Sequence, residues 1–313
     1  MINAIQKFKE SVAPEKTHIE SLFQLILVFG GDADVTKDKY QSCRSVFLNW
    51  AHETKFELAK FLRTPEDFKG EWNKFEGYSN LVEFEKDAGC LSRGILLFSE
   101  CPGAFAELGV FCTDEVLCER LLVVLADEHY DVPFPSFIRL GPVKLIEDKH
   151  TAKAICTVNS TTDKHAFENE VVDVGKALKD IVEATPGSKL FNANRTRDQF
   201  LLIADLVELF GALTDDELGI LLSFMGVNAT NLKRMLNQLI LFELIIKSSE
   251  KTGRYYVPPK QCNPRNPLLD YTAPAGSAFD RAAFKLKAID TALKRDKNRL
   301  KAYEKIHGVR RWI

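Results

Sequence analysis

One glutamate, Glu107, stands where a carboxylate could take part in catalysis. The apolar run 94–98 is typical of a buried parallel strand, and residues 105–111 follow with helical spacing. Between them Pro102 stiffens a turn, and Gly103 lets a ligand approach the backbone closely. Loops at the carboxyl ends of parallel strands bind ligands in open α/β sheets. We therefore expect Glu107 in the first helical turn, facing a small-molecule pocket; the alternative is a carboxylate that only complements the helix dipole.

A second loop with ligand-binding character follows the predicted strand 22–29. It begins with Gly30, Gly31 and Asp32, a strand-to-loop signal of the nucleotide-binding kind that falls short of a full glycine motif. Arg44 lies near the start of the helix that follows. Its guanidinium could hold a ligand carboxylate or phosphate, or it could be a solvated surface group.

Strands and helices alternate through the first half of the chain. Glu66 lies in the loop after a predicted strand at 57–62, and Glu85 lies on a predicted helix at 79–91. Further strands are expected at 121–125 and 152–158. This alternation predicts right-handed βαβ units and a Rossmann-like parallel sheet.

Length and composition are those of a globular protein with two domains. The chain has 313 residues, with 45% hydrophobic and 27% charged residues. No 18-residue apolar stretch and no secretion signal are present, so we expect no membrane contact and a cytoplasmic location. Seven scattered cysteines without a C-x-x-C pair predict neither a disulfide framework nor a metal site.

The net charge of −2 hides an asymmetry along the chain. Residues 1–150 hold 17 basic and 25 acidic residues, whereas residues 279–313 hold 11 basic and 4 acidic ones. An anionic first half disfavours direct nucleic-acid binding there, while the basic end could meet phosphate or an acidic partner.

The pattern becomes mainly helical after residue 160. An amphipathic helix at 165–183 precedes a linker-like break at 185–188, and a basic amphipathic helix is expected at 279–303. Between them come three helical patterns and two short apolar runs around a turn, the order of a winged helix-turn-helix. These segments are 199–210, 214–224, 231–241, 244–247 and 254–257.

Several of these segments together resemble the bacterial retron effectors, which are antiphage toxins with a nucleoside deoxyribosyltransferase-like domain and a winged helix-turn-helix. The resemblance covers most of residues 20–150, and its most specific part is Ser-Glu-x-Pro-Gly-x-Phe-x-Glu-Leu-Gly at 99–109. The remaining matching segments are 29–32, 42–44, 65–67, 81–85 and 141–145.

The resemblance implies cleavage of an N-glycosidic bond. A carboxylate can stabilise or trap the oxocarbenium-like sugar, so Glu107 is the expected nucleophile or stabiliser. The family pattern gives Glu85 as the first candidate for the second acidic group, and Glu66 is the next candidate. No cofactor or metal is expected, and NAD or another nucleotide is the expected substrate. The substrate-binding residues would be Gly30, Gly31, Asp32, Arg44, Glu66, Pro102 and Gly103.

The second half is expected to dock to a partner. Residues 199–258 hold five basic and seven acidic groups, so few basic side chains are available to contact phosphates. This composition favours docking to a protein or an RNA–DNA hybrid over sequence-specific DNA binding. The alternative for the basic helix is packing on its own domain. The expected contact residues are Lys233, Arg234, Lys294, Arg295 and Arg299.

We therefore expect an α/β catalytic domain at 1–160, a connecting helix and linker at 161–190, a winged helix-turn-helix domain at 191–262 and a basic extension at 263–313. The predicted function is an antiphage toxin that hydrolyses NAD to ADP-ribose and nicotinamide. Its retron reverse transcriptase and msDNA, with the msr RNA, would hold it inactive, and a higher-order oligomer is expected. The alternatives are a hydrolase or transferase acting on another nucleotide, and a non-enzymatic winged-helix regulator with a nucleotide-sensing domain.

Overall fold

The chain folds into two compact units. The computed structural model describes residues 1–34, 36–69, 77–131, 136–149, 154–184, 189–250, 253–260 and 267–308. We call Gln24–Trp72 with Asn80–Thr185 the α/β unit. The helical unit comprises Met1–Phe23, Asn73–Ser79 and Pro186–Ile313. The expected linker at 185–188 and the last residues, 309–313, lie outside the described residues.

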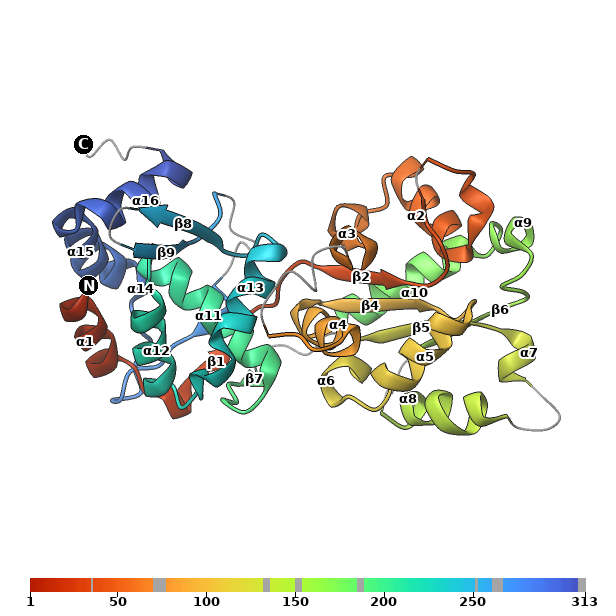
Figure 1. The fold of residues 1–313 in the computed structure, drawn as a ribbon. Coiled ribbons are helices and arrows are strands. Elements are labelled where there is room, and N and C mark those ends of the chain that lie inside the picture. The colour runs from red at the N-terminus through yellow and green to blue at the C-terminus, as the bar shows by residue number, and fades with distance from the viewer. Residues whose placement is uncertain are drawn as a thin grey trace. The chain divides into compact units, whose positions relative to one another are not determined.

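A five-stranded sheet forms the centre of the α/β unit. Its strand order is β3-β2-β4-β5-β6, and every neighbouring pair is parallel, which confirms the predicted α/β class with a parallel sheet (Figure 1). Strands β4 and β5 are buried along their whole length, as apolar runs covered on both faces must be. The strands are β2 (Ile26–Phe29), β3 (Leu62–Arg63), β4 (Gly94–Phe98), β5 (Leu121–Ala126) and β6 (Ile155–Val158).

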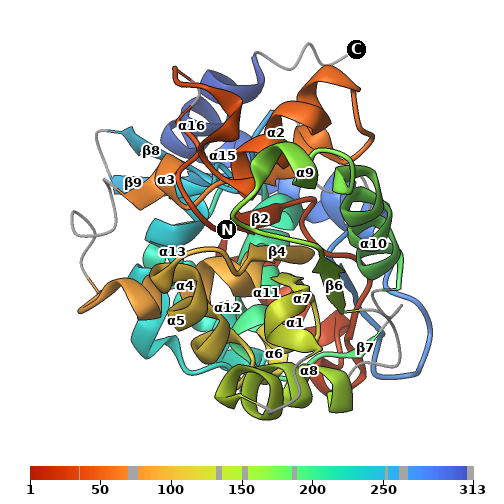
Figure 2. The same ribbon diagram turned by 90° about the vertical axis from the view of Figure 1, so that its right-hand side faces the viewer.

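Helices cover both faces of this sheet (Figure 2). On one face Phe98 of β4 contacts Phe47 of α2 and Phe167 of α9. On the other face Phe29 of β2 packs edge-on against Phe111 of α5, with ring centroids 4.9 Å apart. The helices of the unit are α2 (Cys43–Glu53), α3 (Glu66–Lys69), α4 (Leu81–Leu91), α5 (Pro102–Phe111), α6 (Glu115–Cys118), α7 (Asp127–Tyr130), α8 (Lys144–Lys149), α9 (Lys164–Phe167) and α10 (Val171–Glu183).

Two elements of this unit differ from the prediction. The strand expected at 57–62 is wrong for most of its length, because residues 59–61 form a 3₁₀ turn and β3 has only two residues. The helix expected at 165–183 is broken into α9 and α10. Gly175 of α10 packs against Trp50 of α2, and α10 also contacts β4 and β5. Helix α10 therefore covers the sheet and belongs to the α/β unit instead of connecting two domains.

The helical unit contains the predicted order of three helices and a hairpin. Leu213 forms a bridge to Tyr256 of β9 and so extends the hairpin. The strands and helices of the helical unit are α1 (Ile2–Ser11), β1 (His18–Ile19), β7 (Lys189–Leu190), α11 (Thr196–Phe210), α12 (Asp215–Phe224), α13 (Leu232–Leu241), β8 (Ile246–Glu250), β9 (Gly253–Val257), β10 (Leu269–Asp270), α14 (Arg281–Phe284), α15 (Asp290–Arg295) and α16 (Lys297–His307).

The first 23 residues fold with this helical unit and not with the α/β unit, in contrast to the expected boundary at 1–160. Phe8 of α1 is fully buried among five aromatic rings, including Phe210 of α11 and Tyr271 after β10. Strand β1 also pairs with β7 and β10. An amphipathic helix in sequence shows that it must bury one face, but not which distant segment supplies the partner surface.

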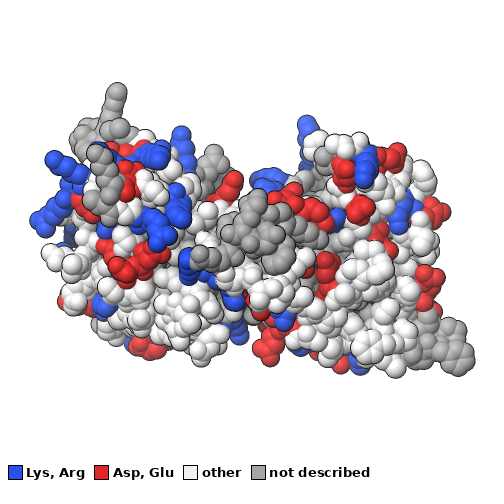
Figure 3. All heavy atoms as spheres, viewed as in Figure 1, with Lys and Arg blue, Asp and Glu red and all other residues white. Residues whose placement is uncertain are grey.

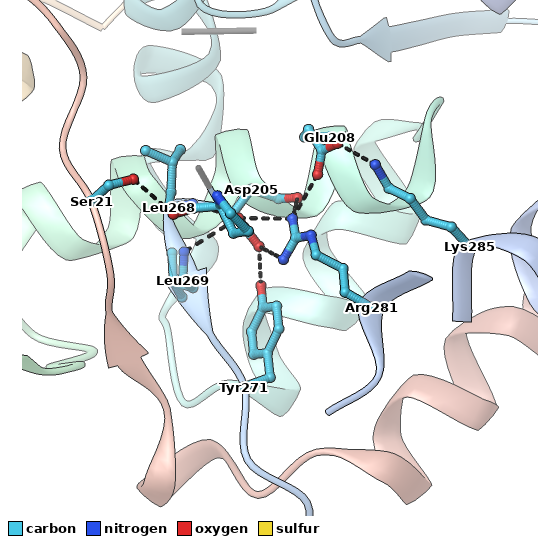
Figure 4. Close-up of polar contacts among 9 residues, drawn as sticks. Ser21, Asp205, Glu208, Leu268, Leu269, Tyr271, Arg281 and Lys285 are labelled. Atoms are coloured by element: carbon cyan, nitrogen blue, oxygen red, sulfur yellow. Dashed lines mark hydrogen bonds and ion pairs between the residues drawn. The ribbon is translucent and has the colours of Figure 1, made fainter. Parts of the chain in front are cut away.

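A buried carboxylate, Asp205, ties the end of the chain to α11 (Figure 4). It accepts hydrogen bonds from the backbone N–H groups of Leu268 and Leu269 and from the hydroxyl of Tyr271 at 2.7 Å. The Arg281 guanidinium adds contacts of 2.9 and 3.1 Å. Because five donor groups share one buried anion, residues 267–281 are held against α11.

The neighbouring Glu208 gives the helical unit an acid-sensitive contact. Burial acts to raise the pKa of its carboxyl, but Arg281 and Lys285 outweigh burial and lower the pKa below its usual value of 4.5. A lowered folded-state pKa contributes stability above the unfolded pKa, and this contribution disappears as the pH falls through the folded value.

We therefore expect the free energy of unfolding to fall between pH 6 and pH 3 more steeply for the wild type than for Glu208→Gln. Urea titrations at several pH values measure this difference. Equal slopes for the two proteins would show that Glu208 contributes nothing to the acid sensitivity.

The described residues contain no helix with the length and apolar character that a membrane crossing requires.

Candidate active site

The strand order defines where a ligand would bind in the α/β unit. The chain runs from β2 outward to β3 and then returns to place β4 on the other side of β2. This is the doubly wound order of flavodoxin-like sheets, in which ligands bind at the carboxyl ends of the two strands flanking the reversal. Here those ends lead into Gly30-Gly31 after β2 and into the segment 99–103 after β4.

Glu107 lies on the helix that begins in the second of these loops. Helix α5 starts at Pro102, because proline has no N–H to lose and its φ suits the first helical position. Glu107 is therefore the sixth helical residue and lies in the second turn, so its expected place in the first turn is wrong. Its side chain is half-buried and borders the buried stripe formed by Ala104, Leu108 and Phe111.

The start of α5 is open beside Glu107. Gly103, one turn before Glu107 on the same side of the helix, is exposed, and a Cβ built there would meet nothing within 4 Å. Cys101 occupies the N-cap position, and within the described residues no side chain caps this helix. Backbone donors and a carboxylate thus share one accessible end of α5.

The loop after β2 is organised differently, because Glu100 fills it. The Glu100 side chain is only 2% exposed. Its Oε1 accepts the N–H groups of Gly31 (3.0 Å) and Arg44 (3.2 Å), and its Oε2 accepts the N–H of Cys43 (2.6 Å). Lys164 Nζ lies 3.4 Å from Oε2. The N–H of Gly31, expected to bind substrate, therefore already has an acceptor inside the protein.

Gly30 is required where this loop turns. Its φ is +149°, and an added Cβ would lie 2.9 Å from Phe98 Cβ and 3.1 Å from Arg44 Cβ. We expect Gly30→Ala to lower the free energy of unfolding by about 1–3 kcal/mol, the usual cost of a strained backbone at a packed position.

Gly109→Ala is the matched control, because Gly109 is helical and has open space around it. Alanine there should stabilise α5 by about 0.5–1 kcal/mol. Urea unfolding of both variants measures the two effects, and equal stabilities would contradict the packing described for Gly30.

Arg44 and Glu66 form an ion pair at the edge of β2 and β3. Arg44 is 2% exposed, and its NH1 lies 2.8 Å from Glu66 Oε2 and 3.4 Å from the carbonyl oxygen of Val28. Arg44 Nε is buried and has no hydrogen-bond partner in the described part of the chain. Arg44 is therefore not a solvated surface group, and the anion that it holds in this structure is the Glu66 carboxylate.

The other residues expected at the site lie on different elements. Asp32 is exposed, and its carbonyl oxygen accepts a 2.6 Å hydrogen bond from the Ser42 hydroxyl. Glu85 is buried in the second turn of α4. It lies one turn before Gly89, where an added Cβ would meet Leu117 of α6 and Ile95 of β4, so Glu85 is on the inward-facing side of α4.

Sequence reasoning missed three groups at the same edge. Glu100 and Lys164 form the ion pair described above, and His129 lies in α7, three residues after the end of β5. The His129 ring packs edge-on against Phe105 of α5, with centroids 5.3 Å apart. The position of His129 just after a buried strand was the available signal, since parallel strands end at one edge.

The residues expected to contact a partner differ in how exposed they are. Arg299 is 4% exposed and binds Glu217 through two hydrogen bonds of 2.8 Å, so it is an internal ion pair and not a surface contact. Arg234 packs over the Tyr78 ring at 5.4 Å, while Lys233 is exposed. Basic side chains gather over α15 and α16 (Figure 3). The exposed ones are Lys294, Arg295, Lys297, Lys301 and Lys305.

Among the described residues, no group of three or more His, Cys, Asp or Glu side chains is placed to hold a metal ion.

Comparison with known proteins shows the family of the chain. Residues 40–247 match the model of a family described as STM3845 retron effector protein. The chain is also 31% identical over 135 residues to the "Retron Ec86 putative ribosyltransferase/DNA-binding protein" of Escherichia coli. This match covers 42% of the chain and 43% of the relative, so it spans less than half the length of either protein. The match of the family model identifies the chain as a member of the STM3845 retron effector family.

Proposed function

We propose that the chain is a retron toxin that cleaves the N-glycosidic bond of a nucleotide, with NAD as substrate and ADP-ribose and nicotinamide as products. The observation that carries this proposal is the position of Glu107. Its half-buried carboxylate stands beside the open start of α5, at the carboxyl edge of a parallel sheet with doubly wound order. The ribosyltransferase name of the Escherichia coli relative supports the same class of chemistry.

The proposed role of Glu107 is to stabilise or trap the sugar. When the bond from C1 of the ribose to the base breaks, positive charge develops on the sugar, and a nearby carboxylate lowers the energy of that state. Nicotinamide leaves as a neutral molecule from a cationic ring, so its departure needs no general acid. Substrate would approach Glu107 past Pro102 and Gly103, where the exposed backbone leaves room.

The second carboxylate is assigned to Glu85. In the hydrolytic reaction it would take a proton from the attacking water, as a general base does. Glu66 is held by Arg44, and we assign this pair to the binding of ribose hydroxyls at the edge of β3. Transfer of the ribosyl group to an acceptor other than water would use the same residues.

The helical unit is proposed to be a winged helix-turn-helix that docks to the retron complex. The order α11, α12, α13 and β8–β9, with the bridge from Leu213 to Tyr256, supports this fold. Exposed basic residues on α15 and α16 would meet the phosphates of the msDNA and its RNA. Binding to msDNA and reverse transcriptase would hold the toxin inactive in a larger assembly.

A direct assay tests the enzymatic proposal. Purified protein, with and without its reverse transcriptase and msDNA, is incubated with NAD and with other nucleotides and deoxynucleotides, and the products are followed by NMR. The proposal predicts free nicotinamide and ADP-ribose from NAD with the isolated chain and slower release with the complex. Cleavage of another nucleotide alone would change the substrate, and no cleavage in any mixture would contradict the enzymatic function.

A further inference from the structure

The start of helix α2 has the features of an anion-binding site, and the Glu100 carboxylate of the same chain occupies it. Ser42 is its N-cap, and the first three helical residues, Cys43, Arg44 and Ser45, present N–H groups at its start. In doubly wound folds such a helix start, next to a glycine loop, is where a ligand phosphate binds. Here the N–H groups of Cys43 and Arg44 donate to Glu100, and that of Ser45 donates to the Ser42 hydroxyl.

The surroundings of Glu100 are those of a bound oxyanion. Three backbone N–H groups from two segments and one lysine converge on a carboxylate that is 98% buried. The backbone is shaped around it, because a Cβ on Gly31 would lie 3.2 Å from Glu100 Oε1 and 2.9 Å from Ser42 Cβ. Glu100 is also separated from the first residue of α5 by a single residue, so the same contacts fix the loop that leads to Glu107.

A ligand phosphate at this position would have to displace the carboxylate or lie beside it. Displacement would leave a buried carboxylate without its donors, and close approach would place two negative charges together. Either event is unfavourable.

We propose that Glu100 takes the place of a ligand phosphate at the carboxyl ends of β2 and β4, and so determines specificity. Any substrate group that contacts the Gly30-Gly31 loop is therefore not phosphorylated. This inference rests on the proposed function for its substrate class, an N-ribosyl compound whose phosphates lie away from α2. A sugar with its only phosphate directed at this loop is excluded.

The proposal is tested by anion binding, which does not depend on turnover. Inorganic phosphate is titrated at constant ionic strength into the full chain, and the thermal midpoint is recorded for wild type, Glu100→Ala and Glu100→Asp. Removing the side chain leaves three N–H donors and Lys164 around an open volume. We expect a saturable, phosphate-dependent rise for Glu100→Ala only, since a ligand that binds the folded state alone raises the midpoint.

Two further variants define the place of binding. Lys164→Ala in the Glu100→Ala background should weaken phosphate binding by about tenfold, the loss expected for one charge-assisted contact. Glu128→Ala removes an exposed carboxylate at the same edge of the sheet and should confer no phosphate response. A Glu100→Ala protein that is folded by circular dichroism but shows no saturable response would overturn the proposal.

A phosphate titration of the wild-type protein tests the proposal even if Glu100→Ala does not fold. In ¹⁵N NMR spectra we expect phosphate to leave the amide signals of Gly31, Cys43 and Arg44 unchanged. Saturable shifts of these signals in the wild type would overturn the proposal. Because neither readout involves NAD, failure of this inference is separate from failure of the enzymatic function: the Glu107→Gln protein should give the same anion results as the wild type.

Discussion

Glu107→Gln is expected to lower the rate of the proposed NAD cleavage on the order of 10³-fold, because it removes the charge proposed to stabilise the developing cation but keeps the size of the side chain. The side chain is half-buried and borders the packed stripe of α5, so the amide should fit without changing the fold. Steady-state kinetics on purified protein should show the loss in kcat and little change in KM, since a carboxylate acting on the reacting carbon matters most in the transition state.

The matched control is Glu115→Gln. Glu115 is an exposed glutamate in the first turn of α6, in the same unit, and its substitution should leave the rate within twofold. Equal thermal midpoints for wild type and Glu107→Gln would show that the loss of activity is not a loss of fold. Full activity of Glu107→Gln on NAD and on every other nucleotide tested would exclude Glu107 from the reaction.

Asp205→Ala is expected to be the most damaging single substitution in the helical unit. It would leave the Arg281 guanidinium, the Tyr271 hydroxyl and the N–H groups of Leu268 and Leu269 without their shared acceptor (Figure 4). Removing one partner of a buried charge pair costs about 3–5 kcal/mol. Because Arg281 keeps its ion pair with Glu208, we expect the cost to lie near the lower end of that range. Urea unfolding should show this loss as a lower midpoint.

Two further variants separate the network from a general effect of losing an aspartate. Asp216 is exposed in the first turn of α12, and Asp216→Ala should change stability by less than about 0.5 kcal/mol. Tyr271→Phe removes one hydrogen bond to Asp205 and should cost about 1 kcal/mol. A cost below 1 kcal/mol for Asp205→Ala would show that the network does not hold residues 267–281 in place.

The inner strands of the central sheet could be predicted because they are uniformly apolar. The runs at 94–98 and 121–126 are buried on both faces, so their sequence carries a continuous signal. Strand β3 has two residues, one of them the exposed Arg63, and no periodicity of that length is distinctive. Helix α5 begins about one turn earlier than predicted, because Pro102 can start a helix as readily as it forms a turn.

The polar contacts of the site could not be predicted, because they join segments far apart in the chain. Glu100 is 69 residues from Gly31 and 56 from Arg44, and nothing in the sequence links a carboxylate to a particular pair of N–H groups. Arg299 shows the same difficulty on a helix: its neighbours Lys297 and Lys301 are exposed, whereas Arg299 turns inward to Glu217. The prediction grouped Arg299 with Lys294 and Arg295 as partner contacts, because charge along the sequence does not distinguish an inward-facing arginine from an exposed one.

Metabolite profiling in cells that express the chain without its retron partners would show whether the chain cleaves a nucleotide and whether cleavage depends on Glu107. Mass spectrometry would compare the wild type with Glu107→Ala at equal protein levels. We expect NAD to fall, and ADP-ribose and nicotinamide to rise, only with the wild type. If no nucleotide changes in a Glu107-dependent way, either in these cells or in infected cells that carry the whole retron, the chain is not the enzyme proposed here.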